Sequence, residues 1–96
     1  MSSGKLKITV RFFAYFRELF KANMRQIELD TGSKVKDLVT LLCESESQKT
    51  ELIERDSLKQ HVMIMINGHH LMSLNGFDTL LEDGDTVAIF PLLGGG

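Results

Sequence analysis

The sequence is poor in the residues on which several classes of functional site depend. Its 96 residues include one cysteine, one proline and no tryptophan. A single cysteine excludes a disulfide framework and, within one chain, a metal site built from thiolates. Eleven basic residues stand against thirteen acidic ones, giving a formal charge of −2, so the strongly basic face that binds nucleic acid is absent. No apolar run approaches the roughly 20 residues that span a bilayer.

What the sequence does contain is enough for one folded domain. Hydrophobic residues make up 43% of the chain and charged residues 25%, which is a globular composition rather than a disordered one. A chain of this length forms a single domain with a single core. We therefore expect one domain over residues 1–96, located in the cytoplasm, with neither nucleic acid nor a membrane as its partner.

The first third of the chain predicts two strands joined by a short helix. Apolar and polar residues alternate from Lys5 to Phe13, which is the period of a strand with one face on a core. Phe13 departs from the alternation, because its parity places an aromatic ring on the polar face. Residues 14–20 are typical of one or two helical turns, and a second strand is expected from Met24 to Asp30, with Ile27 facing inward.

An amphipathic helix should follow, because an apolar stripe recurs at helical spacing. The stripe consists of Val35, Leu38, Val39 and Leu42. Ser33 is the expected N-cap, and the helix is expected to continue to about Glu46. The polar segment 45–60 is interpreted as a loop with a short helix near residues 50–55.

The last third predicts the remaining strands of a sheet. The apolar run Val62–Ile66 indicates a central strand covered on both faces, and Asn67-Gly68 is a hairpin signal. A final strand is expected from Thr86 to Phe90, ended by Pro91. The order β-β-α-β-(β)-β favours an α+β roll of the β-grasp, ubiquitin-like kind. Its mixed sheet would have four or five strands, with one main helix on one face and the last strand beside the first.

No catalytic or metal-binding cluster is evident inside the chain. His69 and His70 are adjacent in the expected hairpin and should point apart, so we interpret them as solvated histidines. Cys43 follows the buried stripe of the helix and is interpreted as a packed thiol rather than a nucleophile. Arg17 and Glu18 are interpreted as a surface pair. We expect no bound metal and no bound cofactor.

Two features suggest a function that depends on other proteins. The sequence ends in Gly94-Gly95-Gly96, and a glycine carboxylate without side chains near it can thread a narrow channel and be adenylated there. The simpler alternative is a frayed end or a cloning remnant. In addition, Phe13, Met63, Met65 and Phe90 share the sheet face opposite the helix, if Ile64 and Ile66 point inward. This apolar surface is a candidate docking site, unless the segment 45–60 covers it.

Three segments resemble the MoaD-like small subunits of molybdopterin synthase. They are the string Val-Arg-Phe-Phe-Ala-Tyr-Phe-Arg-Glu-Leu from Val10 to Leu19, the string Leu-Glu-Asp-Gly-Asp-Thr-Val-Ala-Ile-Phe-Pro from Leu81 to Pro91, and the terminal glycines. The resemblance covers residues 5–44 and 62–96, and the Phe-Phe-Ala-x-x-Arg-Glu string is its most specific part.

The resemblance implies a sulfur carrier whose last glycine becomes a thiocarboxylate. A MoeB-like adenylyltransferase would use ATP to adenylate Gly96, with Gly95 as the other residue of the reactive pair. The loaded chain would then enter a MoaE-like large synthase subunit and donate sulfur to a pterin precursor, for the molybdenum or tungsten cofactor. The implied partner-binding residues are Phe13, Met65, Leu71, Phe90, Pro91, Leu92, Leu93 and Gly94, with a flexible tail from about residue 91.

Other functions fit the same pattern. A third glycine departs from the pair that usually ends this family. Related carriers supply sulfur for thiamine, for thiolated tRNA or for cysteine, although thiamine carriers tend to lack the Phe-Phe-Ala-x-x-Arg-Glu string. The same activated glycine could instead be joined to lysines of other proteins. A ubiquitin-like interaction module would use the sheet surface and never activate its tail.

Overall fold

The computed structural model describes residues 4–55 and 57–92. Leu93, Gly94, Gly95 and Gly96, for which the sequence predicted functional roles, lie outside these residues. The strands are β1 (Lys5–Phe12), β2 (Met24–Asp30), β3 (Ile53–Glu54), β4 (Ser57–Leu58), β5 (Val62–Ile66), β6 (His69–His70) and β7 (Thr86–Pro91). The α-helices are α1 (Phe16–Phe20), α2 (Val35–Leu42) and α3 (Glu46–Leu52), and two short 3₁₀ turns, η1 (Leu71–Ser73) and η2 (Gly76–Asp78), precede β7.

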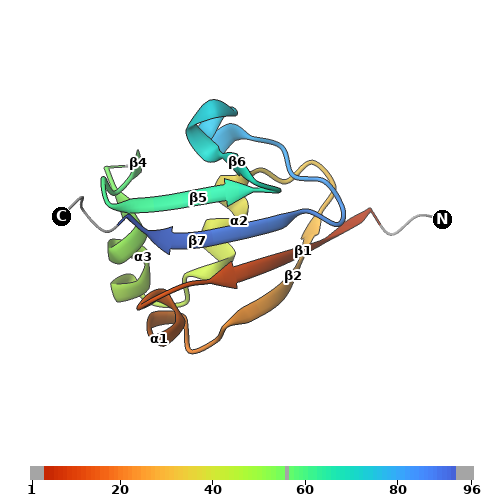
Figure 1. Cartoon of the computed structure of the whole chain (residues 1–96). Coiled ribbons are helices and arrows are strands. Elements are labelled where there is room, and N and C mark those ends of the chain that lie inside the picture. Colours follow the sequence, from red (N-terminus) through yellow and green to blue (C-terminus); the bar gives the residue numbers. More distant parts are fainter. Residues whose placement is uncertain (1–3, 56, 93–96) are drawn as a thin grey trace.

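The main sheet has five strands in the order β2-β1-β7-β5-β6 (Figure 1). β1 pairs antiparallel with β2 and parallel with β7, so the first and last strands lie side by side at the centre of a mixed sheet. This confirms the α+β roll predicted from the order of elements. The hairpin between β5 and β6 turns at Asn67 and Gly68, whose φ angles of 51° and 86° explain why the sequence uses Asn-Gly there.

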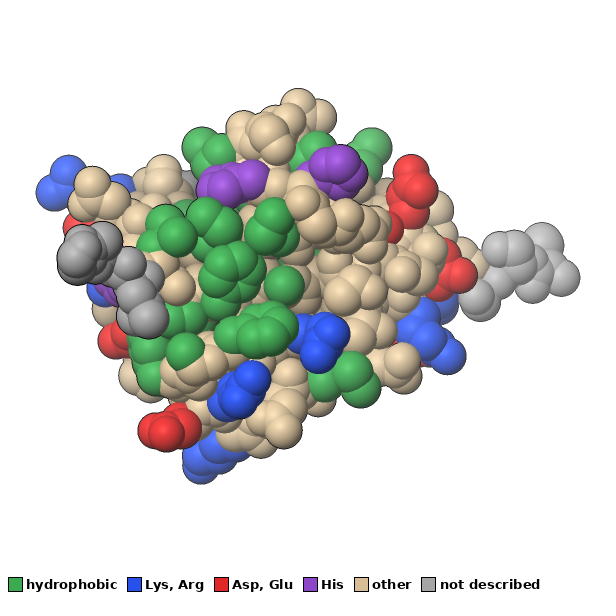
Figure 2. Space-filling view, viewed as in Figure 1, with side chains coloured by type: hydrophobic (Ala, Val, Ile, Leu, Met, Phe, Trp, Pro, Cys, Tyr) green, Lys and Arg blue, Asp and Glu red, His purple; other side chains and the backbone are tan. Residues whose placement is uncertain are grey.

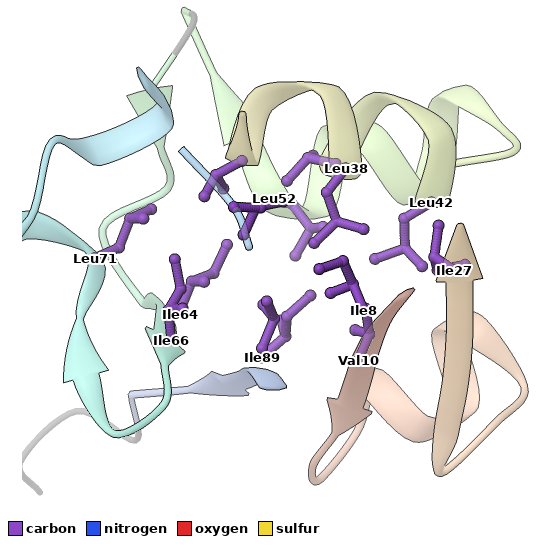
Figure 3. Packing of buried hydrophobic residues seen from close by; sticks show 14 of the residues in the cluster. Ile8, Val10, Ile27, Leu38, Leu42, Leu52, Ile64, Ile66, Leu71 and Ile89 are labelled. Atoms are coloured by element: carbon purple, nitrogen blue, oxygen red, sulfur yellow. The ribbon is translucent and has the colours of Figure 1, made fainter. Parts of the chain in front are cut away.

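One face of the sheet carries the hydrophobic core, and α2 and α3 cover it (Figure 3). Ile8, Ile64 and Ile89 contribute fully buried side chains from three neighbouring strands. α2 buries the predicted stripe Val35, Leu38, Val39 and Leu42 against them. In the described part of the chain no polar or charged residue is buried, so the core stabilises the fold through apolar burial.

The predicted boundaries of α2 were wrong at both ends. The helix is capped by Lys34, whose backbone N–H donates to the carboxylate of Asp37 at 2.8 Å. Ser33 instead belongs to the preceding turn, where its N–H donates to the carbonyl of Asp30. The helix ends at Leu42 rather than near Glu46, because Cys43 adopts an extended conformation (φ −82°, ψ 105°).

The polar segment that follows folds differently from the prediction. The helix expected near residues 50–55 lies earlier, at 46–52, because Ser45 caps it by accepting a hydrogen bond from the N–H of Gln48 at 3.3 Å. Leu52 anchors this helix in the core with its side chain fully buried. After it, β3 and β4 form a separate two-stranded hairpin.

β5 is an interior strand between β7 and β6, but only one of its faces is covered by the described helices, whereas both were predicted to be covered. Val62, Ile64 and Ile66 point into the core, whereas Met63 and Met65 are half-buried on the opposite face. The apolar run Val62–Ile66 therefore does not mean that both faces of β5 are buried. One face lies in the core, and the other is apolar but is not covered by a described helix.

The backbone conformation of Lys21, at the end of α1, predicts how a substitution there changes stability. This residue adopts the left-handed conformation (φ 57°, ψ 39°) while its N–H donates to the carbonyl of Arg17. A residue with a Cβ is disfavoured there by about 1 kcal/mol relative to glycine. We expect Lys21→Gly to raise the free energy of unfolding by up to about 1 kcal/mol in chemical denaturation. Lys36→Gly, the same change inside α2, should instead lower it by about 1 kcal/mol, and two changes of the same sign would contradict the explanation.

Candidate functional site

The strand register brings five apolar residues together on the sheet face opposite the helices. Met63 is paired with Phe90, and Met65 with Ala88. Phe13, directly after β1, donates its N–H to the carbonyl of Ile89 and places its ring against that of Phe90. We call Phe13, Met63, Met65, Ala88 and Phe90 the apolar face. Figure 2 shows hydrophobic side chains gathered over β5, β7 and the end of β1.

Aromatic packing organises this face around the end of β7. The rings of Phe13 and Phe90 meet edge to face, with centroids 5.9 Å apart and planes at 86°. Such pairs stabilise by about 0.5–1.5 kcal/mol beyond their burial. All five residues are half-buried rather than buried, so they keep area available for a partner. The predicted positions of Phe13 and Phe90 relative to the helix are confirmed.

Segment 45–60, which was considered as a possible cover for the apolar face, does not cover it. α3 packs on the opposite side of the sheet, where Leu52 joins the core with Ile64 and Ile89 (Figure 3). The face is visible in the space-filling view with the helices behind the sheet (Figure 2). The described residues of this segment therefore leave it open.

Two arginines border the apolar face, and the sequence interpretation missed their role. The guanidinium carbons of Arg11 and Arg17 lie 5.6 and 5.7 Å from the centroid of the Phe13 ring. Arg17 also donates from Nε to the carbonyl of Phe12 at 3.1 Å, so it is held on this face rather than paired with Glu18 as interpreted. Strand alternation could have placed Arg11 here, because it shares its parity with Phe13. The position of Arg17 depends on how the chain turns into α1, and the spacing of apolar residues in the sequence does not predict that turn.

Pro91 and Leu92, the last described residues, are bonded to the neighbouring strand beside this face. Pro91 pairs with Val62, and the N–H of Leu92 donates to the carbonyl of His61 at 2.7 Å. The sheet therefore holds Pro91 and Leu92, the first two residues of the flexible tail that was expected from about residue 91. Pro91 is half-buried and Leu92 is 43% exposed, which leaves both accessible beside Phe90.

Leu71 does not lie on the surface where the resemblance implied it. Its side chain is 1% exposed, because η1 turns it into the core after β6. His70 fixes this turn, since its Nδ1 accepts a hydrogen bond from the N–H of Met72 at 2.9 Å. This contact gives His70 a structural role in the turn, whereas the sequence interpretation treated it only as a solvated histidine. The next residue, Met72, is the exposed one, at 71%.

Cys43 is half-buried, and burial raises the pKa of its thiol to about 11, partly offset by the nearby Lys49. Thiolate is the reactive form, so at pH 8 we expect alkylation to be about a hundredfold slower in the folded chain than in the unfolded one. The free energy of unfolding should also fall as the pH rises above about 9. The unfolded chain then releases the Cys43 thiol proton, whereas the folded chain retains it. Iodoacetamide labelling with and without denaturant measures the first effect, and equal rates would contradict it.

Within residues 4–55 and 57–92, no group of histidine, cysteine, aspartate and glutamate has the geometry of a metal site. In the same residues, no helix has both the length and the apolar character required to cross a membrane.

A β-grasp domain with an apolar sheet face beside its last strand defines a ubiquitin-like protein. Comparison with known proteins identifies the group more closely: the model of the ThiS family matches residues 10–96. The small archaeal modifier protein 3 of Haloferax volcanii is 35% identical over 92 residues, which are 95% of this chain and 100% of that protein. The chain belongs to the ThiS family of ubiquitin-like sulfur carriers and modifiers.

Solved structures agree with this assignment. The small archaeal modifier protein 1 from Methanosarcina acetivorans superposes with a TM-score of 0.80 and 28% identity, covering 96% of this chain and 98% of that one. A putative molybdopterin converting factor, subunit 1, from Pyrococcus furiosus gives a TM-score of 0.74 and 30% identity, covering 92% of this chain and 99% of that one. The MoaD-like resemblance and the ubiquitin-like fold are thus both supported.

Proposed function

We propose that this chain is the sulfur-carrying small subunit of a molybdopterin synthase. The observation that supports the proposal best is the open apolar face at the end of β7, from which the chain continues through Leu92 towards three consecutive glycines. A carrier needs a surface for docking and a reactive end close to it. The likeness to the molybdopterin converting factor subunit of Pyrococcus furiosus favours this pathway.

The proposed reaction takes place at the carboxylate of Gly96. Inside a MoeB-like adenylyltransferase, this carboxylate attacks the α-phosphate of ATP, and pyrophosphate leaves. A sulfur donor then displaces AMP from the acyl adenylate, which gives a thiocarboxylate. In a MoaE-like large subunit the thiocarboxylate passes its sulfur to a pterin precursor, and hydrolysis of the acyl group restores the carboxylate. ATP belongs to the activating enzyme, so this chain needs no cofactor of its own.

In this proposal the apolar face brings the tail to both partners. Phe13 and Phe90 supply aromatic anchors, and Met63 and Met65 add adaptable apolar contact. Arg11 and Arg17 at its border favour a partner whose apolar surface is bordered by carboxylates. The partner supplies the catalytic side chains, and the chain acts as a protein co-substrate rather than as an enzyme.

A second candidate function is protein modification, which the small archaeal modifier protein 3 of Haloferax volcanii favours through its 35% identity and its name. Activation by ATP is the same in this case, but the ε-amino group of a lysine on another protein attacks the activated glycine. Sulfur carriage to thiamine, tRNA or cysteine is a further version of the carrier function. These alternatives differ in the acceptor and not in the adenylation step.

The proposal is tested by the intact mass of the chain after incubation with ATP, a sulfide source and a MoeB-like enzyme. A gain equal to the exchange of one oxygen for sulfur, mapped to Gly96, is the expected result. Addition of a MoaE-like subunit and a pterin precursor should then return the mass to its starting value. A stable thiocarboxylate that no MoaE-like subunit discharges would exclude the molybdopterin pathway, and a ladder of heavier lysine adducts would favour the modifier.

A further inference from the structure

All four methionines that the structure describes lie outside the buried core. The buried side chains of this part of the chain are leucine, isoleucine, valine and phenylalanine. Met24 and Met72 are 55% and 71% exposed, and Met63 and Met65 are half-buried on the apolar face. Peroxide converts a methionine thioether, which is apolar, into a polar sulfoxide. The position of each methionine therefore decides what oxidation does to the molecule.

Met63 and Met65 lie in the apolar face itself. They are two residues apart on β5, so their side chains leave the sheet on the same side. Met63 is paired with Phe90 on β7. Met65 is paired with Ala88 on β7 and with His70 on β6. Because paired residues have Cβ atoms about 4.5–5.5 Å apart, a polar group at either methionine alters the hydrophobic surface around Phe90 (Figure 2).

We propose that Met63 and Met65 form an oxidative modification site, at which hydrogen peroxide converts the thioethers to sulfoxides and closes the apolar face to its partners. The inference rests on the proposed function, because that function makes the apolar face the docking surface. In the modification step the sulfur attacks one oxygen of the peroxide, an S–O bond forms, the O–O bond breaks, and water leaves. The sulfur is oxidised by two electrons. In the reverse step two thiols become a disulfide while the oxygen leaves as water.

The sulfoxide opposes docking without opposing folding. In the free chain Met63 and Met65 are half-buried, so a sulfoxide oxygen on either side chain stays in contact with water. In the complex the same oxygen is buried against apolar atoms without a hydrogen-bond donor, which penalises a polar group. We therefore expect oxidation to raise the dissociation constant of the complex at least about tenfold.

Docking and oxidation compete for the same two side chains. A partner seated on the apolar face covers Met63 and Met65. Met24 lies on the outer strand β2, with β1 between it and β7, and Met72 lies in η1 after β6. The docked chain should therefore be oxidised more slowly at Met63 and Met65 than the free chain, and at an unchanged rate at Met72. The site responds to peroxide while the apolar face is free.

The experiment compares the chain before and after treatment with hydrogen peroxide, with the sulfoxides located by peptide mass mapping. Calorimetry with a MoeB-like adenylyltransferase measures the dissociation constant. We expect it to rise at least about tenfold once Met63 and Met65 carry sulfoxides. Treatment with a sulfoxide reductase and a thiol should return it to its starting value. The melting temperature should stay close to that of the untreated chain, because no described methionine belongs to the core.

Two matched double variants separate the apolar face from the other methionines. Leucine has nearly the volume of methionine and no oxidisable sulfur, so Met63→Leu combined with Met65→Leu should bind normally both before and after peroxide. Met24→Leu combined with Met72→Leu removes the same number of thioethers and should stay as sensitive as the unaltered chain. Both variants retain Cys43, so oxidation of its thiol does not account for a difference between them.

Failure of this inference and failure of the proposed function give different results. An untreated chain that does not bind the activating enzyme contradicts the docking surface, and the inference falls with it. Normal binding by the untreated chain, with an unchanged dissociation constant after both sulfoxides have been mapped, overturns the inference alone. Equal sensitivity of the two double variants does the same. A loss of cooperative unfolding on oxidation also overturns it, because binding would then be lost through the fold.

Discussion

Gly96→Ala is expected to leave the chain folded and able to bind its activating enzyme, but to lower the rate of thiocarboxylate formation by about a hundredfold. A misplacement of about 1 Å at a reacting centre costs a rate factor of that order. A methyl group at Gly96 would enlarge the end of the chain where it threads the channel of the partner, and would displace the carboxylate from the α-phosphate of ATP. Intact-mass time courses at equal partner concentration measure the loading rate.

Two controls make this result specific. Gly94→Ala introduces the same methyl group two residues before the reactive carboxylate, and we expect it to load at nearly the normal rate. The melting temperature of Gly96→Ala should equal that of the unaltered chain, because every residue of the described core is unchanged. Normal loading of Gly96→Ala would show that the partner tolerates a side chain at residue 96, and the explanation from the absence of a side chain there would be wrong.

The sequence predicted the parts of this fold that follow a simple period. Alternation from Lys5 to Phe12 and from Met24 to Asp30 fixes which side chains enter the core, and strand pairing preserves that phase. The positions of Phe13 and Phe90 followed from the same parity. These predictions succeed because the two faces of a strand are set locally, by the geometry of the backbone.

Errors arose where a contact between distant segments decides the outcome. Ser33 has the side chain of an N-cap, but the turn that binds it to Asp30 and Leu81 leaves Lys34 at the start of α2. Leu71 resembled an interface residue by its distance from β5, yet η1 rotates it into the core. The interaction of Arg17 with Phe12 and Phe13 likewise depends on how the chain turns after β1, and the local sequence does not determine this.

Phe90→Glu is expected to weaken the complex with either partner by about 2–4 kcal/mol, which corresponds to a dissociation constant roughly 30-fold to 1,000-fold higher. Phe90 is the centre of the apolar face, in contact with Phe13 and paired with Met63. In the free chain a glutamate at this half-exposed position remains hydrated. In the complex it would be buried opposite apolar atoms without a partner for its charge. Isothermal calorimetry or biolayer interferometry with the activating enzyme measures the loss.

The matched control for Phe90→Glu is Leu80→Glu, which adds the same charge at a 60% exposed residue bridged to Lys34, away from the apolar face. It should bind normally, whereas equal weakening of both variants would point to a general effect of charge. Phe90→Glu and Gly96→Ala should also differ in how their loading rates depend on enzyme concentration. Phe90→Glu should recover loading at saturating concentrations of the activating enzyme, because its Gly96 is intact, whereas Gly96→Ala should not recover at any concentration. If both variants load at the normal rate at limiting enzyme, the roles proposed for the apolar face and for the terminal glycine in loading are wrong.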